Sequence, residues 1–380
     1  MSDVSKDHLT ALDDFRKEID SIDQQLVYQL SKRQKLVEQI VALKKAHNLP
    51  VYHPAREENL ISDKRQQARQ AGLDPDYVEE LYRIILRRSR VEQTGHMASK
   101  GVRPGATVLI VGGPGEMGRY FEQWFINAGY QVRVMGSKGW PEIAKLCAGI
   151  DLAIISVPIE KTADIIKQIG PYLPEEAVLA DVTSIKKIPL CAMLKAHKGP
   201  VLGLHPLFGP TTSTMDKQIV VATPGRDDDA CQWVIDQLST WGAIIVMSDA
   251  DEHDEIMAIV QALRHFTTFT FGQFLASQKI KLERTLEFSS PIYRLELGMV
   301  GRLFAQDASL YAEIIFASRE RRELLKEYIE KLSNNLNMLE EGGKALFEEE
   351  FNKIAKWFGP FSEQAMRESS FLIDKLIERF

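Results

Sequence analysis

One uninterrupted apolar periodicity runs from residue 7 to about residue 46, and neither proline nor glycine breaks it. Apolar side chains recur there every three or four residues, which predicts a single amphipathic helix. At a rise of 1.5 Å per residue, roughly 40 residues span about 60 Å. The two shorter helices predicted at about 56–71 and 76–93 cannot cover that length. We therefore expect an all-helical domain over residues 1–95 whose long helix packs against a second chain in an intertwined homodimer.

Two cations of this helix lie where the periodicity calls for apolar side chains. Arg33 falls between Leu30 and Val37, and Lys44 lies about three turns further along the same face. Burying unpaired cations costs on the order of several kcal/mol, which favours an anion bound between them. Polar residues that set the register of a coiled coil, or long side chains with solvated ends, are the alternative interpretation.

Other polar residues of the helical region are placed to join such a site. Arg16 lies about 25 Å along the helix from Arg33, so it can contribute only to the site of a partner chain. Two hydrogen-bonding residues share one face of the third helix. The candidates on the shorter helices are Arg56, Glu57, Ser89 and Gln93.

This spaced set resembles that of the all-α chorismate mutases, and the resemblance covers the first 95 residues. It implies that Arg33 and the partner's Arg16 clamp the two carboxylates of chorismate. It also implies that Lys44 and Gln93 hydrogen-bond the ether oxygen whose bond breaks.

The resemblance further implies that Arg56 and Glu57 orient the substrate, with Glu57 near its hydroxyl group, and that Ser89 belongs to the same site. A Claisen rearrangement transfers no proton and needs no nucleophile. The protein can accelerate it only by holding the compact conformer and stabilising charge on the ether oxygen, for which cations and an amide suffice.

Composition excludes several other classes of protein. The 380 residues carry a formal charge of −6, which offers no basic face for nucleic acid. No apolar run approaches the roughly 20 residues of a membrane span, and the N-terminal residues lack the apolar core of a signal peptide, so we expect a cytoplasmic protein. The three cysteines lack the spacing of a metal site, and we expect no metal.

A different rhythm begins after residues 96–106, which gain Gly, Ser and Pro and are predicted to be a linker. Over residues 107–249, continuous apolar runs alternate with helical stretches, as in strands that are covered on both faces. This pattern predicts an α/β Rossmann-like domain with a mostly parallel sheet. Residues 250–380 return to amphipathic helical patterns, which predict a C-terminal all-α domain for substrate binding and dimerisation.

The first apolar run leads into GGPGEMG, in which Gly113, Gly115 and Gly118 satisfy G-x-G-x-x-G. The motif directly follows a predicted strand and begins a predicted helix. Glycines in this position let the backbone approach a pyrophosphate at a helix N-terminus, whose dipole favours anions. The sequence therefore predicts a dinucleotide site.

The second strand departs from the pattern for NAD, because it should end in an acidic residue that binds the ribose diol. It is followed instead by Ser137 and Lys138, which could accept a 2′-phosphate. NAD is the expected cofactor, and NADP is not excluded.

Further candidates lie at the carboxyl ends of the later strands, where ligands of such sheets bind. Ser156 and Pro158 follow the third predicted strand and are expected beside the cofactor, and Ser184 follows the fourth. His205 ends an apolar strand, which is a suitable place for a general base that faces cofactor and substrate. A packed core histidine is the competing interpretation.

In the C-terminal helices, Arg294 and Arg302 interrupt apolar faces. His253 and His265 are candidates for lining one cleft. Core packing of the histidines and solvation of the arginines are the alternatives.

The stretches GLHPLFGP, SSPIYRLELGMVGRLFAQD and IVQALRHF resemble prephenate dehydrogenases, over residues 104–380. The whole chain resembles the bifunctional chorismate mutase/prephenate dehydrogenases of bacterial tyrosine biosynthesis. This resemblance implies that His205 hydrogen-bonds the ring hydroxyl of prephenate and accepts its proton while hydride leaves the same carbon for the nicotinamide.

The same resemblance implies roles for four further residues. Ser184 would orient His205 and the ring hydroxyl, and Arg302 would bind a carboxylate of prephenate. Arg294 would support the site. His265 is implied in the response to tyrosine, the feedback inhibitor of the family.

Two other classes of protein fit parts of the sequence. A dehydrogenase of a 3-hydroxy acid with an N-terminal coiled-coil assembly domain would explain the glycine motif without a mutase. A non-catalytic redox sensor would bind a dinucleotide and contact a partner through its helices.

Overall fold

The computed structural model describes residues 4–47, 54–97, 101–212 and 214–377, and the side chain of Lys44 lies outside those it describes. Contacts between residues divide the chain into two units. The first consists of Met1–Val157, Ile166–Val182 and Leu190–Ser248, and the second of Pro158–Ile165, Thr183–Pro189 and Asp249–Phe380. None of the described helices is both long enough and apolar enough to cross a membrane.

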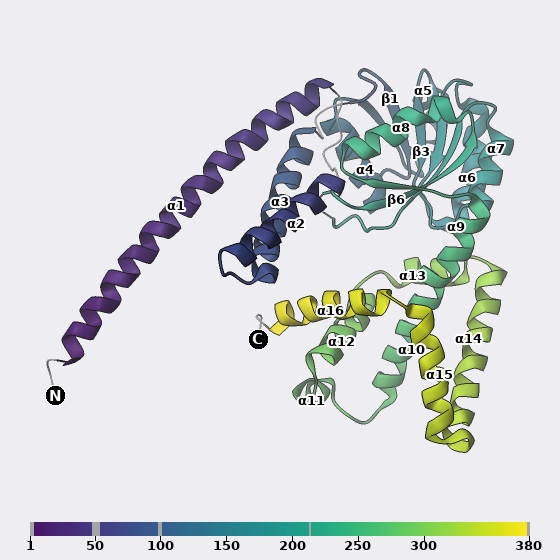
Figure 1. Cartoon of the computed structure of the whole chain (residues 1–380). Coiled ribbons are helices and arrows are strands. Elements are labelled where there is room, and N and C mark those ends of the chain that lie inside the picture. The colour runs from purple at the N-terminus through teal and green to yellow at the C-terminus, as the bar shows by residue number, and fades with distance from the viewer. Residues whose placement is uncertain (1–3, 48–53, 98–100, 213, 378–380) are drawn as a thin grey trace. The chain divides into compact units, whose positions relative to one another are not determined.

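The N-terminal part of the first unit is helical, as expected. It contains α1 (Val4–His47), α2 (Pro54–Gln70) and α3 (Pro75–Met97). The C-terminal half of α1 contacts α3, and Val37 and Val41 are buried there. The N-terminal half runs clear of α2 and α3 (Figure 1), and four of its large apolar side chains, with Leu26 just beyond them, are at least half exposed. These are Leu12, Phe15, Ile19, Ile22 and Leu26.

A seven-stranded sheet forms the rest of the first unit. Its strands are β1 (Thr107–Val111), β2 (Gln131–Met135), β3 (Leu152–Ile155), β4 (Val178–Asp181), β5 (Val201–Pro206), β6 (Ile219–Arg226) and β7 (Ile244–Met247). The order is β2-β1-β3-β4-β5-β6-β7, and every neighbouring pair is parallel except β5 and β6. The expected mostly parallel sheet is confirmed, and β1, β3, β4 and β5 end at one edge of it.

Apolar side chains cover both faces of the sheet. Successive residues of a strand point to opposite faces, and Val108, Leu109 and Ile110 are all 0% exposed. On one face, Phe121 of α4 and Val234 of α8 belong to a single buried core. The helical elements along the sheet are α4 (Glu116–Asn127), η1 (Trp140–Glu142), α5 (Ile143–Cys147), α6 (Ile159–Ile169), η2 (Gly170–Tyr172), α7 (Lys187–Ala196) and α8 (Asp228–Thr240).

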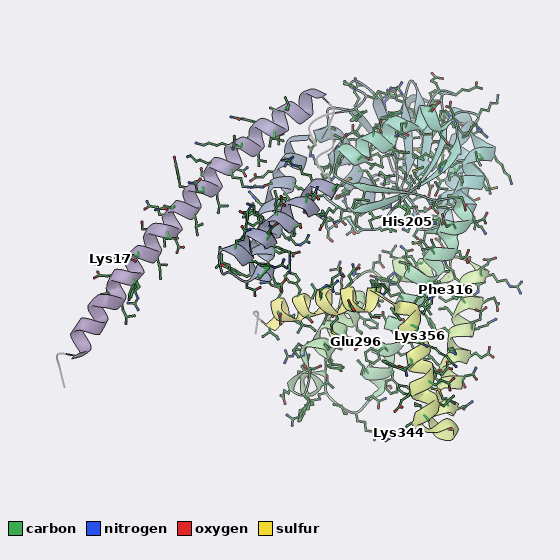
Figure 2. The ribbon with its side chains drawn as sticks, in the orientation of Figure 1. Lys17, His205, Glu296, Phe316, Lys344 and Lys356 are labelled. Carbon is green, nitrogen blue, oxygen red and sulfur yellow. The ribbon has the colours of Figure 1, made fainter. Side chains whose placement is uncertain are left out.

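The second unit is built mainly from the C-terminal helices, which confirms the expected all-α part. They are α9 (Ala250–Met257), the π-helical η3 (Ala258–Leu263), α10 (Arg264–Ser277), α11 (Leu282–Glu287), α12 (Pro291–Phe304), α13 (Ala308–Phe316), α14 (Arg319–Asn337), the π-helical η4 (Met338–Gly342), α15 (Gly343–Phe358) and α16 (Phe361–Ile377). Leu297, Val300 and Leu325 are buried between them. Phe316 (Figure 2) and Trp357 are 69% and 81% exposed, so a single copy leaves large apolar side chains in contact with solvent.

Candidate active sites

The glycine-rich turn connects the end of β1 to the start of α4 and lies close to Ser156, the residue after β3. A Cβ at Gly113 would lie 2.1 Å from Cγ1 of Val134, and one at Gly118 would lie 2.6 Å from the carbonyl oxygen of Gly112. Gly115 is the N-cap residue of α4. The first-turn amides of α4 therefore open onto a tight backbone turn at the carboxyl edge of the sheet, as a pyrophosphate site requires.

Gly112 is a further constrained residue of this turn, which the motif did not single out. Its φ is +90°, and a Cβ there would lie 2.0 Å from the carbonyl oxygen of Ser156. No other residue type fits so close an approach of two strands at this φ. The doubled glycine in the sequence is the signal that could have revealed it.

Gly118→Ala is expected to destabilise the protein by about 1–3 kcal/mol, because the new Cβ is overpacked against backbone atoms that cannot swing away. Gly115→Ala is the matched control, since its Cβ would be 3.2 Å from the nearest atom, the carbonyl oxygen of Gly112. Thermal unfolding without nucleotide should show a clearly lower midpoint for Gly118→Ala than for Gly115→Ala, whose contact is longer. Equal midpoints for the two variants would contradict the packing described here.

The residues expected beside the cofactor have different surroundings. Ser137 and Lys138 are exposed in the loop after β2. Ser156 is half-buried after β3 and donates its backbone N–H to the carbonyl of Val111 at 2.8 Å. Pro158 is exposed, and its carbonyl accepts a hydrogen bond from the Thr162 hydroxyl at 3.1 Å.

His205 (labelled in Figure 2) lies at the carboxyl end of β5. Because β1, β3, β4 and β5 are parallel, this is the same edge of the sheet as the glycine turn. Its side chain is 3% exposed, and its backbone is paired with that of Val221 in β6. The pairing of β5 with β4 ends at Gly203, so at His205 the strand is paired on the β6 side only.

Ser184 lies between β4 and α7 and belongs to the second unit. Its hydroxyl is buried, and among the described residues it has no hydrogen-bond partner. A buried hydroxyl without a partner costs free energy unless a ligand completes it. This is the property expected of a group that binds substrate.

Arg302 and His265 line one small pocket of the second unit, together with Arg264 and Gln306. His265 packs edge-on against Tyr311, with ring centroids 4.8 Å apart. Burial lowers the pKa of His265 to about 4, and the nearby arginines act in the same direction. At neutral pH its imidazole is therefore uncharged, and the pocket presents two cations to an anionic group.

A larger apolar cavity of about 500 Å³ adjoins this pocket, and His265 lines both. His253 is not among the residues that line either of these two cavities. His253 is 2% exposed, and its Nδ1 lies 2.8 Å from Oδ1 of Asp254. The π-helical turn η3 between the two histidines alters the rotation that a regular helix would give.

Arg294 connects two helices of the second unit. Its Nε donates to the Ser289 hydroxyl at 2.8 Å, and its Nη2 donates to the carbonyl of Leu286 at 2.9 Å. The guanidinium thus joins the end of α11 to the start of α12, the helix that carries Arg302. This arrangement fits the supporting role implied for Arg294.

In the helical part of the first unit, the structure brings Arg33 and Ser89 together. Nη1 of Arg33 donates to the Ser89 hydroxyl at 2.6 Å, and that hydroxyl donates to the carbonyl of Ile85 at 2.9 Å. Gln93 is 9% exposed one turn further along α3. Arg33 is half-buried. Arg33, the cation on the apolar face of α1, therefore meets the face of α3 that carries Ser89.

Arg16 is not part of this group in a single chain. Its side chain is 70% exposed and pairs with Asp13 of the same helix at 3.1 Å. That placement leaves open the expected role of Arg16 in a partner's site. Arg56 is exposed at the start of α2.

Glu57 belongs to a cluster of charges that the sequence did not predict. Both of its carboxylate oxygens accept from Nη1 of Arg90 at 2.7 Å, and Lys217 lies 3.6 Å away. Nε of Arg90 also donates to Asp216 at 3.1 Å. Burial opposes the charge on Arg90, but Glu57 and Asp216 outweigh it and raise its pKa. The cluster joins α2 and α3 to the loop before β6.

Three family models match consecutive parts of the chain. Chorismate mutase type II matches residues 15–94, the nucleotide-binding domain of prephenate dehydrogenase matches residues 128–247, and the dimerization domain of prephenate dehydrogenase matches residues 249–357. The protein is thus an enzyme with two activities, a chorismate mutase joined to a prephenate dehydrogenase. These matches decide against both the 3-hydroxy acid dehydrogenase and the redox sensor.

Two curated relatives span nearly the whole chain. The T-protein of Enterobacter agglomerans is 43% identical over 372 residues, covering 96% of this chain and 97% of that protein. The T-protein of Haemophilus influenzae is 40% identical over 368 residues, covering 97% of each. The chain belongs to the T-protein family.

Solved structures show the same fold in the dehydrogenase part. The prephenate dehydrogenase from A. aeolicus, in complex with hydroxyphenyl propionate and NAD+, has a TM-score of 0.54 at 19% identity. The match covers 70% of this chain and 99% of that one.

Proposed function

We propose that the chain converts chorismate to 4-hydroxyphenylpyruvate in two steps with prephenate between them, and that NAD accepts the hydride in the second. One observation carries the dehydrogenase half of the proposal. The glycine turn after β1 and the buried His205 of β5 lie at one edge of the sheet, the edge at which such folds bind ligands.

For the first step, we infer that Arg33, Ser89 and Gln93 bind chorismate, joined by Lys44, Arg56, Glu57 and the partner's Arg16. The contact between Arg33 and the Ser89 hydroxyl supports this, because it directs a half-buried cation toward the two hydrogen-bonding residues of α3. Held in its compact conformer, chorismate breaks its ether C–O bond as the new C–C bond forms. Positive charge and an amide beside the ether oxygen stabilise that transition state.

For the second step, NAD supplies the hydride acceptor. His205 accepts the proton of the ring hydroxyl as hydride leaves the same carbon, and loss of CO2 makes the ring aromatic. Ser184 orients that hydroxyl through its own buried Oγ. Arg302 binds a carboxylate of prephenate, and Arg294 maintains the helix that carries it.

The choice of NAD follows from the nucleotide-binding fold and from the NAD+ present in the A. aeolicus relative. Ser137 and Lys138 are the residues that would admit a 2′-phosphate, and both are exposed after β2. We expect weaker use of NADP, because a solvated lysine contributes little net binding energy.

We infer that the enzyme is a cytoplasmic homodimer. The exposed apolar row on α1 and the match to a dimerization domain both support a second copy. We also infer inhibition by tyrosine, to which His265 responds from its position between the small pocket and the apolar cavity.

A spectrophotometric assay tests the whole proposal. Prephenate with NAD should produce reduced nicotinamide, and chorismate with NAD should do so after a lag, because the enzyme makes its own prephenate. NADP should give a slower rate, and added tyrosine should lower the rate with NAD. Reduction of neither nucleotide with prephenate would refute the proposal.

A further inference from the structure

Two side chains from other helices of the second unit hold the backbone of the segment that begins at Ser184. Nη2 of Arg321 in α14 donates to the carbonyl oxygen of Ser184 at 3.3 Å. The backbone amides of Lys186 and Lys187 donate to the two carboxylate oxygens of Asp254 in α9, at 2.7 and 3.1 Å. The backbone is therefore held just before and just after the turn into α7.

Arg321 is an unusual residue for the start of a surface helix. It is 2% exposed, whereas Arg319 in the same turn has an 83% exposed side chain. Its Nη1 donates to the carbonyl of Ile314 near the end of α13. Burial lowers its pKa, and the charge of Asp254 opposes that effect. Burying a guanidinium is costly, so its hydrogen bonds to two carbonyls must fix its position closely.

Asp254 is held in turn by His253. The 2.8 Å contact between Nδ1 of His253 and Oδ1 of Asp254 lies in a region where His253 is almost fully buried. Burial opposes the charge on Asp254, but the bonds from His253 and from the amides of Lys187 and Lys186 outweigh it and lower its pKa. The second anchor is therefore a rigid carboxylate.

We propose that Arg321 and Asp254 are positioning residues of the dehydrogenase, which place the Ser184 hydroxyl for reaction by fixing the backbone at the Ser184 carbonyl and at the amides of Lys186 and Lys187. The inference rests on the role proposed above for Ser184. The Ser184 hydroxyl is buried and has no partner among the described residues, so no hydrogen bond of its own sets its position. Its location follows from the backbone, and the backbone is set by the two anchors.

Arg321→Met is the direct test, because it keeps an unbranched apolar stem and removes the guanidinium donors. Dehydrogenase turnover with prephenate should fall by about 100-fold, the cost of moving a reacting group by about 1 Å. The KM for NAD and the chorismate mutase rate should stay at their wild-type values. Arg319→Met, on the exposed side of the same helix, should change none of these quantities.

A double-mutant cycle separates positioning from general support of the fold. If Arg321 acts through Ser184, Arg321→Met combined with Ser184→Ala should be no slower than Ser184→Ala alone, within about twofold. If Arg321 only stabilises the helices, the two losses should multiply. Asp254→Asn should give the same non-multiplying result with Ser184→Ala.

The outcomes distinguish the inference from the proposed function. Wild-type turnover in Ser184→Ala would overturn the role proposed for Ser184 and, with it, the inference, but would leave the proposed reaction standing. A slow Ser184→Ala with a wild-type Arg321→Met, or multiplying losses, would overturn the inference alone. If Arg321→Met fails to fold by thermal unfolding, Arg321→Lys takes its place in the cycle, with a smaller loss that should again vanish in the Ser184→Ala background.

Discussion

His205→Asn is expected to lower prephenate dehydrogenase turnover by roughly 10²- to 10⁴-fold, the contribution typical of a general base, and to leave the chorismate mutase rate unchanged. Asparagine keeps a hydrogen-bonding group at the end of β5 but cannot take a proton from the ring hydroxyl. The KM for NAD should change little, since the glycine turn is untouched. Absorbance of reduced nicotinamide and loss of chorismate measure the two activities separately.

His197→Asn is the matched control for this variant. His197 is 4% exposed against 3% for His205, lies in the same unit, and has its Nε2 2.7 Å from the carbonyl oxygen of Ala177. Burial lowers its pKa. We expect a small loss of stability and normal turnover from this variant. Equal dehydrogenase losses in both variants would mean that His205 serves packing rather than proton transfer.

The strands could be predicted from the sequence because both faces of the sheet are buried. Continuous apolar runs such as TVLIV coincide with strands such as β1 to within a residue or two. The sheet order and the antiparallel pairing of β6 could not be predicted, since they depend on contacts between distant segments. Gly112 was missed for a similar reason, because its constraint comes from the carbonyl of Ser156 in another strand.

Charged side chains were the least predictable part of the candidate sites. Arg90 and Asp216 are far apart in the chain, and nothing in their local patterns indicates that they meet. Arg321 lies in the run RERRE, where periodicity alone does not separate a buried guanidinium from solvated neighbours. Arg33 was predictable because a long regular helix fixes which face each residue occupies, and that face meets Ser89 as expected.

Arg33→Ala is expected to reduce chorismate mutase activity by about 30-fold or more, because removing the cation that pairs with a substrate carboxylate costs about 2 kcal/mol or more, even though Arg33 is only half-buried. Dehydrogenase activity with added prephenate should remain normal. Lys32→Ala is the control. Lys32 is the neighbouring cation, but it is exposed and its Nζ lies 4.9 Å from the ring centroid of Tyr28 on the same helix. Equal mutase rates for the two variants would count against an anion bound beside Arg33.

Mixing two impaired variants tests whether the mutase site is shared between chains. If Arg33 of one protomer works with the partner's Arg16, a dimer that pairs Arg33→Ala with Arg16→Ala has one site with both changes and one intact site. Random pairing makes about half of the dimers mixed, so co-refolded variants should recover about a quarter of wild-type mutase activity. Each variant alone should stay well below that level, Arg33→Ala at about one thirtieth of wild type or less. No recovery would mean that Arg16 acts within its own chain or outside the site, and the long exposed face of α1 would then need another explanation.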